Sequence, residues 1–483
     1  MIKLVKERKR GKMVFSTMLF LWVFLPAVII GYHLIGFVPA SEDKKIRIKN
    51  AFLLVASLVF YAWGGPRYLF LMLAVIVINY VCALLIDKNP SSKKMILIAG
   101  ITCDLLLLGY FKYFNLMVHT IERITGHASF ELTEVILPIG ISFYIFQSMS
   151  YTIDVYRNDA PVQKNIFDFA LYVSLFPQLI AGPIVQYRDI SSQLLSRCES
   201  INLFSEGAGR FIYGLSKKVL LANVFGEAVD GIWKRGPGDI GCALSIFAAI
   251  LYSLQIYYDF SGYSDMAIGL AKMFGFELKE NFNHPYMASS VSEFWRRWHI
   301  SLSSWFKNYV YIPLGGNRVG IARCCLNLFI VFALTGIWHG ANYTFFFWGI
   351  YYAAFLIIEK LISHFLNKEI RSHIYTLIVV IIGWVFFRAD SIGDAFAFIR
   401  AFFNISVPSY PILEYLTLKM CLAFVAGVLL CGPVQKIMKD RLKTLNDKPV
   451  FTAISIVAKA ALMIMCILCL AGDTYNPFIY FRF

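Results

Sequence analysis

Residues 326–349 read LNLFIVFALTGIWHGANYTFFFWG, a long apolar run with a polar interruption. An α-helix needs about 20 mostly apolar residues to cross a bilayer, so this stretch predicts a membrane span. An ionisable group inside a span is costly, which makes His339 a functional candidate. Its glycine neighbours let another backbone or a ligand approach closely, and Trp338 with the aromatic residues after it can wall off a pocket. The residues that interrupt the run are Thr335, Gly336, His339, Gly340 and Asn342.

Comparable apolar runs occupy most of the chain. It has 483 residues, of which 58% are hydrophobic and 16% charged, whereas a soluble chain is about 25% charged. The sequence therefore predicts an all-α polytopic membrane protein with about ten to twelve spans. The short runs 50–64 and 374–388 are expected to be tilted, re-entrant or packed inside protein. The apolar runs are 14–38, 50–64, 67–87, 95–117, 135–153, 166–184, 208–225, 241–260, 325–342, 343–363, 374–388, 414–432 and 450–471.

The first apolar run follows a basic head, residues 1–12. This arrangement resembles a secretory signal peptide, but the run is too long and no small-residue cleavage site follows it. We therefore expect an uncleaved first span. Because no hydrophilic stretch is long enough to fold alone, the predicted organisation is a basic tail over 1–12 and a single membrane domain over 13–483.

The net charge is +15, and the basic residues gather between the apolar runs. Such charges orient membrane proteins and meet anionic headgroups, so the expected partner is membrane lipid, not nucleic acid. The tail, the first loop and the loop after residue 87 are all basic, which leaves the orientation open. The ten cysteines include Cys466 and Cys469, a CxxC inside an apolar run. This spacing fits small buried residues better than a metal or redox site, and no disulfide framework is expected.

A second unusual segment, residues 291–309, reads VSEFWRRWHISLSSWFKNY. At 100° per residue it predicts one amphipathic helix, with Ser292 as its N-cap and Glu293 stabilising its N-terminus. His299 lies in the middle of the aromatic face. There it is either a functional group or a histidine satisfied by one buried hydrogen bond. The aromatic face holds Trp295, Trp298, His299, Leu302, Trp305, Phe306 and Tyr309, and the polar face Arg296, Arg297, Ser303, Ser304, Lys307 and Asn308.

Further charged residues lie within this segment and before and after it in the chain. A basic cluster lies beside the turn at Gly315–Gly316 and could bind a phosphate-bearing ligand or lipid phosphate; it comprises Arg296, Arg297, Lys307 and Arg318. Asp259 and Asp265 lie at the end of an apolar run, where they could orient a histidine, bind substrate or cap the helix. The sequence has no nucleophile-elbow, Walker or HExxH motif that would indicate a different chemistry. The remaining candidates, His299 and His339, suit general acid–base catalysis.

The longest of these motifs resemble the membrane-bound O-acyltransferase family, above all its bacterial branch with the membrane subunits of alginate O-acetyltransferases. They are SEFWRRWHISLSSWFKNYVYIPLGGNR (292–318) and GIWHGANYTFFFWG (336–349), with further matches at 137–157, 176–187, 255–276 and 476–483. The resemblance implies a horseshoe of helices around a funnel through the membrane. It also implies that the family's near-invariant histidine corresponds to His339 and its second polar position to His299.

The resemblance further implies transfer of an acetyl group from cytoplasmic acetyl-CoA across a bacterial cytoplasmic membrane, for O-acetylation of a secreted polysaccharide. His339 would act as general base or carry the acyl group, and His299 would orient the donor or stabilise the oxyanion. An extracytoplasmic partner of the SGNH-hydrolase type would complete delivery, and no bound cofactor or metal is expected. The other expected substrate-binding residues are Arg296, Arg297, Lys307, Arg318, Asp259, Asp265, Trp338 and Asn342.

Three alternatives stay open at this point. The chain could transfer D-alanine from a carrier-protein thioester to teichoic acid, or it could acylate a lipid or peptide. Broken helices and intramembrane histidines also suit a transporter or channel without acyl-transfer chemistry. The acceptor is equally open among alginate, cellulose, peptidoglycan and other glycans.

Overall fold

The computed structural model describes residues 13–126, 134–407, 410–434, 437, 441, 449–472 and 475–479. The predicted basic tail over 1–12 and the last four residues of the 476–483 motif lie outside the described residues. Within the described part of the chain, all regular structure is helical and there is no strand. The predicted all-α class is therefore confirmed.

Eight helices in the described residues are long and apolar enough to cross a membrane. Two further apolar helices, α17 (His373–Arg388) and α19 (Leu418–Leu430), are shorter, so the described residues contain fewer spans than the ten to twelve that were expected. The chain is thus a multi-pass membrane protein. The eight spans are Phe20–Phe37 with α2 (Leu25–Leu34), α3 (Glu42–Gly64), α4 (Pro66–Lys88), α5 (Lys93–Thr125), α12 (Cys242–Met273), α15 (Ile321–His339), α16 (Tyr343–Leu366) and Thr452–Gly472 within α21 (Pro449–Gly472).

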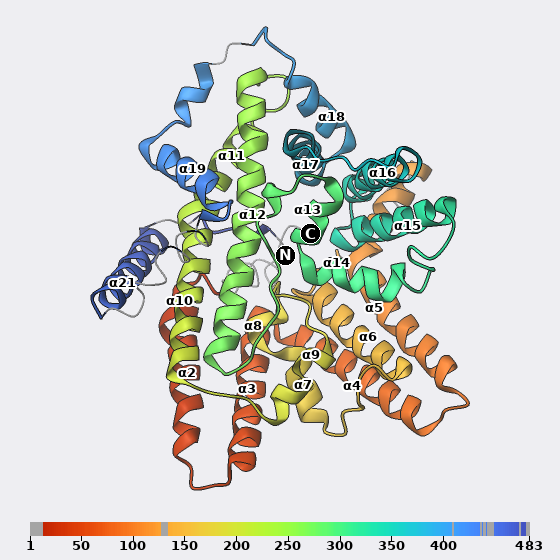
Figure 1. The fold of residues 1–483 in the computed structure, drawn as a ribbon, viewed down its shortest axis with the longest axis vertical. Helices are drawn as coiled ribbons and strands as arrows, with labels where there is room; N and C mark the ends of the chain where they lie inside the picture. Colours follow the sequence, from red (N-terminus) through yellow and green to blue (C-terminus); the bar gives the residue numbers. More distant parts are fainter. Residues whose placement is uncertain are drawn as a thin grey trace. The chain divides into compact units, whose positions relative to one another are not determined.

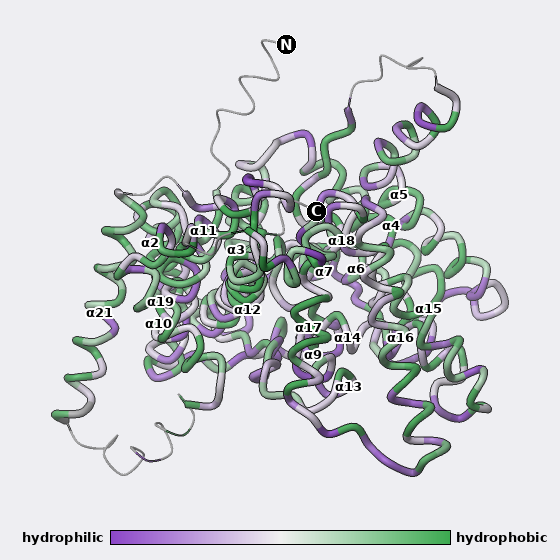
Figure 2. Tube along the Cα trace, turned by 90° about the horizontal axis from the view of Figure 1, so that it is seen from above, coloured by the Kyte–Doolittle hydropathy of each residue, from purple (hydrophilic) through white to green (hydrophobic). Residues whose placement is uncertain are grey.

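The helix α21 shows why lipid must be the solvent. Only 6% of its most apolar stretch is buried inside the protein, and large side chains such as Val457 and Leu468 are about two-thirds exposed, at 67% and 65%. Figure 2 shows the same hydrophobic colouring along this helix and along much of the other long helices. In water such a surface would drive aggregation, whereas in a bilayer it is the required face.

Not every predicted run forms one span. The run 166–184 divides into α7 (Ile166–Ser174) and the short α8 (Phe176–Leu179). The reason is Pro177, which is tolerated in the first turn of α8 but would break a continuous helix. The run 208–225 falls across α10 (Ile201–Ser216), a π-helical turn at Lys217–Ala222 and α11 (Asn223–Trp233).

The chain forms two compact units. Unit 1 comprises the chain up to Phe211 together with Ser264–Lys279, and unit 2 comprises Ile212–Tyr263 and everything from Glu280 onward. The prediction of a single domain, and that of a horseshoe around a funnel, both stay predictions.

Buried polar contacts hold unit 1 together. Within the apolar helices, the Asn79 amide on α4 donates to both oxygens of Asp104 on α5, at 3.1 and 3.0 Å, and accepts from Thr152 on α6 (Ile141–Arg157) at 2.7 Å. Interhelical hydrogen bonds of this kind satisfy polar groups that lipid cannot. The contacts therefore join three helices of unit 1 through side chains that are all buried.

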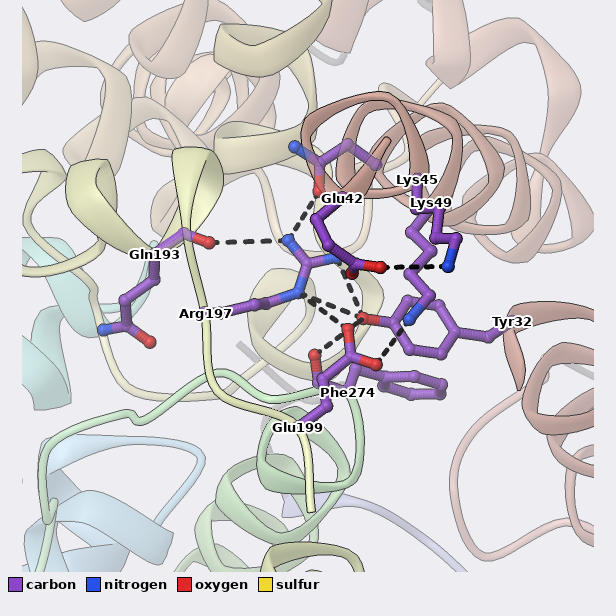
Figure 3. A network of polar contacts seen from close by, with 9 residues as sticks. Tyr32, Glu42, Lys45, Lys49, Gln193, Arg197, Glu199 and Phe274 are labelled. Carbon is purple, nitrogen blue, oxygen red and sulfur yellow. Dashed lines mark hydrogen bonds and ion pairs between the residues drawn. The ribbon is translucent and has the colours of Figure 1, made fainter. Parts of the chain in front are cut away.

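A second polar cluster joins α2 and α3 to the segment after α9 (Tyr187–Leu195), as Figure 3 shows. Arg197 donates to the Tyr32 hydroxyl at 2.9 Å, and that hydroxyl donates to Glu199 at 2.6 Å. Lys49 forms an ion pair with the same carboxylate. Burial opposes ionisation of Glu199, but its hydrogen bonds from Lys49 and Tyr32 lower the pKa of the carboxyl below its ordinary value.

In unit 2, α15 and α16 lie side by side (Figure 1) and approach closely through two glycines. A Cβ on Gly336 would stand 2.4 Å from the Phe345 carbonyl oxygen, and one on Gly349 would stand 2.3 Å from that of Phe332. Only glycine permits this backbone approach. The close packing brings the end of α15, where His339 lies, against the aromatic residues of α16.

Candidate functional site

The segment 291–311 is not the single helix that was predicted. It forms α13 (Val291–Arg297), α14 (Ile300–Phe306) and a π-helical turn at Lys307–Tyr311. The break falls at His299, whose φ of 43° and ψ of 55° are left-handed and cannot continue a right-handed helix. The predicted N-cap is also wrong by two positions, because the Ser290 side chain accepts the Glu293 N–H at 3.0 Å.

The predicted separation of the two faces is nevertheless confirmed. Every residue of the predicted aromatic face is buried, and every residue of the predicted polar face is at least partly exposed. The two short helices keep the same side toward the protein interior, because each has its own apolar stripe. The break therefore changes the direction of the backbone at His299 but leaves its side chain buried.

His299 is only 1% exposed. Its Nδ1 lies 3.2 Å from the Asn281 Oδ1, and its ring meets Phe260 edge-on, with 4.6 Å between the ring centroids. The residue belongs to none of the spanning helices. Burial lowers the pKa of His299 to about 3, so the imidazole is neutral at physiological pH.

His339 is the last residue of α15 and is 5% exposed. Aromatic rings enclose it: the centroids of Trp348 and Phe387 lie 5.0 and 5.2 Å from that of the imidazole. The Trp338 ring contacts both histidines, at 5.1 Å from His339 and 6.1 Å from His299. The two predicted catalytic histidines, which are forty positions apart in the chain, thus contact the same side chain, the indole of Trp338.

A cavity of about 1020 Å³ lies between α13, α14, α15 and α16. Its lining includes Thr335, one helical turn before His339 on α15. It also includes Trp295, whose indole lies 5.5 Å from that of Trp348, and Trp348 packs on His339. Neither His299 nor His339 lines the cavity, and its link to His339 runs through Trp295 and Trp348. The cavity is large enough for a small organic ligand.

Basic side chains line this cavity, but they are not the four that were predicted together. Arg296 and Lys307 do line it, and the cations that sequence reasoning missed are Lys360 and Arg371. Arg297 instead pairs with Glu293 at 2.6 Å, and Arg318 is exposed and not part of the lining. The signal for Lys360 was a pair of adjacent charges, Glu359 and Lys360, late in an apolar run.

The predicted acidic and amide residues have other partners. Asp259 lies inside α12 and not at its end, so helix capping is the wrong alternative; it pairs with Lys218 at 2.6 Å and accepts the Ile479 N–H at 2.7 Å. Asp265 belongs to unit 1, where it pairs with Arg210 at 2.9 Å. Asn342 caps α16 and donates to the Asp390 carbonyl at 2.9 Å. These contacts favour structural roles.

Asn281 is a further residue that sequence reasoning missed. It is fully buried, and its side chain contacts His299 and Ser301. The polar stretch at 281–284 between two apolar regions was the available signal. Within the described residues, no group of three or more His, Cys, Asp or Glu side chains could hold a metal ion, and all ten cysteines are free thiols.

Several known proteins are similar to this chain in sequence. The chain is 38% identical to a probable alginate O-acetylase of Pseudomonas putida, over 98% of this chain and 100% of that protein. It is 36% identical to a peptidoglycan O-acetyltransferase of Helicobacter pylori, over 79% of this chain and 78% of that protein. It is also 25% identical to a teichoic acid D-alanyltransferase of Bacillus subtilis, over 50% and 65%.

The sequence pattern of one family covers most of the site. It matches residues 58–392, which include α12 to α17 and both histidines. This match agrees with the acyl-transfer chemistry in the relatives' names. The chain is an O-acyltransferase and belongs to the membrane-bound O-acyltransferase family.

Proposed function

We propose that the chain moves an acetyl group from cytoplasmic acetyl-CoA to the hydroxyls of a secreted polysaccharide, with His339 at the centre of the reaction. The observation that carries this proposal is the contact of both His339 and His299 with the Trp338 ring, near a cavity lined by four cations and three carboxylates. A buried, aromatic-walled histidine suits proton transfer, because water is excluded from the reacting groups.

The chemistry needs one base. The acceptor O–H gives its proton to a ring nitrogen of His339, and its oxygen bonds to the thioester carbonyl carbon. The C–S bond then breaks, and the departing thiolate takes the proton from His339, which leaves an ester and a free thiol. In a two-step variant His339 carries the acetyl group between donor and acceptor. His299 orients the donor or stabilises the oxyanion.

The cavity suits the phosphate-bearing end of acetyl-CoA. In the described residues, Arg296, Lys307 and Lys360 form no ion pair with a carboxylate. Glu359, the acid beside Lys360 in the lining, instead accepts the N–H groups of Val291 and Ser292 at 2.7 and 2.9 Å. These cations are therefore available for phosphate.

The acceptor and partner follow from the relatives. Those with the higher identities are named for alginate and for peptidoglycan, and both are polysaccharides outside the cytoplasm. We therefore place the chain in the bacterial cytoplasmic membrane, with an extracytoplasmic SGNH-hydrolase-like protein to complete delivery. D-alanyl transfer from a carrier protein is the second candidate, because the D-alanyltransferase matches half of this chain.

Purified protein in liposomes tests the proposal. With radiolabelled acetyl-CoA outside and a polysaccharide inside, together with the SGNH-type partner, we expect labelled ester on the glycan and none with His339→Ala. His364→Ala is the matched control, because His364 is exposed in the last turn of α16. Unchanged labelling by folded His339→Ala would refute the role of His339. Flux of a solute without any ester would favour a transporter, and label only from D-alanyl carrier protein would favour the second candidate.

A further inference from the structure

The backbone at His299 is strained, and Asn281 binds the residues that follow it. A left-handed conformation in a residue other than glycine costs about 1–3 kcal/mol and persists only where its surroundings impose it. The Asn281 carbonyl accepts the Ile300 N–H at 2.9 Å, and the Asn281 Oδ1 accepts the Ser301 N–H at 3.1 Å. Asn281 thus binds the two residues that follow His299, which fixes the break between α13 and α14.

The same side chain decides which ring nitrogen of His299 carries the proton. A backbone N–H can only donate, so the Asn281 atom that meets the Ser301 N–H is the amide oxygen. That oxygen can only accept, and it lies 3.2 Å from the His299 Nδ1. In a neutral imidazole one nitrogen donates and the other accepts. The proton therefore belongs on Nδ1, and Nε2 has the lone pair.

This tautomer distinguishes between the two roles proposed for His299, which are to orient the donor and to stabilise the oxyanion. An Nε2 that has a lone pair cannot donate a hydrogen bond to an oxyanion, but it can accept one from an N–H group. The pantetheine arm of acetyl-CoA has an amide N–H two carbons from the sulfur, close to the reacting thioester. Nε2 as acceptor can therefore orient the donor.

We propose that Asn281 is a positioning residue that holds His299 with its proton on Nδ1, so that Nε2 accepts a hydrogen bond from the thioester donor. The proposal rests on the proposed function for its choice of donor. Its structural half, the tautomer, does not depend on activity.

The tautomer is measured directly. In protein labelled with ¹⁵N-histidine, the resonances of His299 are assigned by their loss in His299→Gln. We expect Nδ1 to show the shift of a protonated nitrogen and Nε2 that of an unprotonated one. Ser301→Ala, which removes a second 2.9 Å hydrogen bond to the same oxygen, is the matched control and is expected to keep this tautomer. A proton on Nε2 in the unaltered protein would overturn the proposal, whatever the variants do.

Kinetics test the consequence. Asn281→Leu keeps the size of the side chain but removes the acceptor, and we expect kcat/KM for acetyl-CoA to fall roughly 10–100-fold. Asn281→Asp restores an acceptor and should recover most of that loss. A folded Asn281→Leu with unchanged kcat/KM would refute the positioning role and leave the proposed function intact. Absence of acetyl transfer by the unaltered protein would refute the proposed function, while the tautomer could still be read.

Discussion

Lys218 and Asp259 form a buried ion pair in unit 2 whose disruption should be severe. Their side chains are 4% and 2% exposed, with 2.6 Å between Nζ and Oδ1. The other oxygen of Asp259 accepts the Ile479 N–H at 2.7 Å, and Lys218 also donates to the Pro477 carbonyl. The two residues of the pair therefore bind Pro477 and Ile479, which ties that segment to α12 and to the π-helical turn at Lys217–Ala222.

Replacing Lys218 by methionine keeps the length of the side chain but leaves the Asp259 charge buried with one neutral donor. Removal of one partner from a buried pair costs about 3–5 kcal/mol. For a folding unit of this size that corresponds to a fall of roughly 6–20 °C in the midpoint of thermal unfolding. The midpoint is measured in one detergent at one scan rate, because unfolding is expected to be irreversible.

Two further variants make the experiment decisive. Both the double variant, Lys218→Met with Asp259→Leu, and Lys218→Met alone leave the Pro477 carbonyl without its Lys218 donor. The double variant removes both charges and additionally leaves only the Ile479 N–H without its acceptor, a cost of about 1–3 kcal/mol, so it should be more stable than Lys218→Met alone. Lys234→Met, at an exposed lysine, should change stability by less than about 0.5 kcal/mol. If Lys218→Met unfolds at the same temperature as the unaltered protein, the assignment of this pair to stability is wrong.

Three other predictions concern packing, pH and donor binding. Gly336→Ala should lower the unfolding midpoint markedly, because its Cβ would stand 2.4 Å from the Phe345 carbonyl; an unaltered midpoint would contradict the close helix approach. The lowered pKa of Glu199 means that its contribution to stability is present above the ordinary value of 4.5 and is lost as the pH falls through the folded-state pKa. Denaturation curves across that range should therefore converge for the unaltered protein and Glu199→Gln at acid pH, and equal stability near pH 7 would refute the role of the Lys49 pair. Lys360→Ala should raise KM for acetyl-CoA more than it lowers kcat, with a weaker dependence on salt; an unchanged KM would exclude that cation from the donor site.

Local physical chemistry decides the class of this protein, and the sequence shows it directly. The cost of polar backbone in lipid makes every long apolar run a helix, which is why the all-α class and most of the spans were predictable. The alternation of aromatic and polar residues over 291–309 likewise predicts which side chains are buried, because it depends only on helical periodicity. The motifs around His299 and His339 pointed to the family in the same way.

Only the tertiary structure decides how those side chains work together. Helical periodicity contains no sign that the helix breaks at His299, because the left-handed turn is bound by Asn281, eighteen positions earlier. The meeting of both histidines on Trp338 depends on the packing of separate helices. The partners of Asp259, which are Lys218 and Ile479, also lie far from it in the chain. Long-range contacts of this kind depend on the whole fold, and no local pattern of residues encodes them.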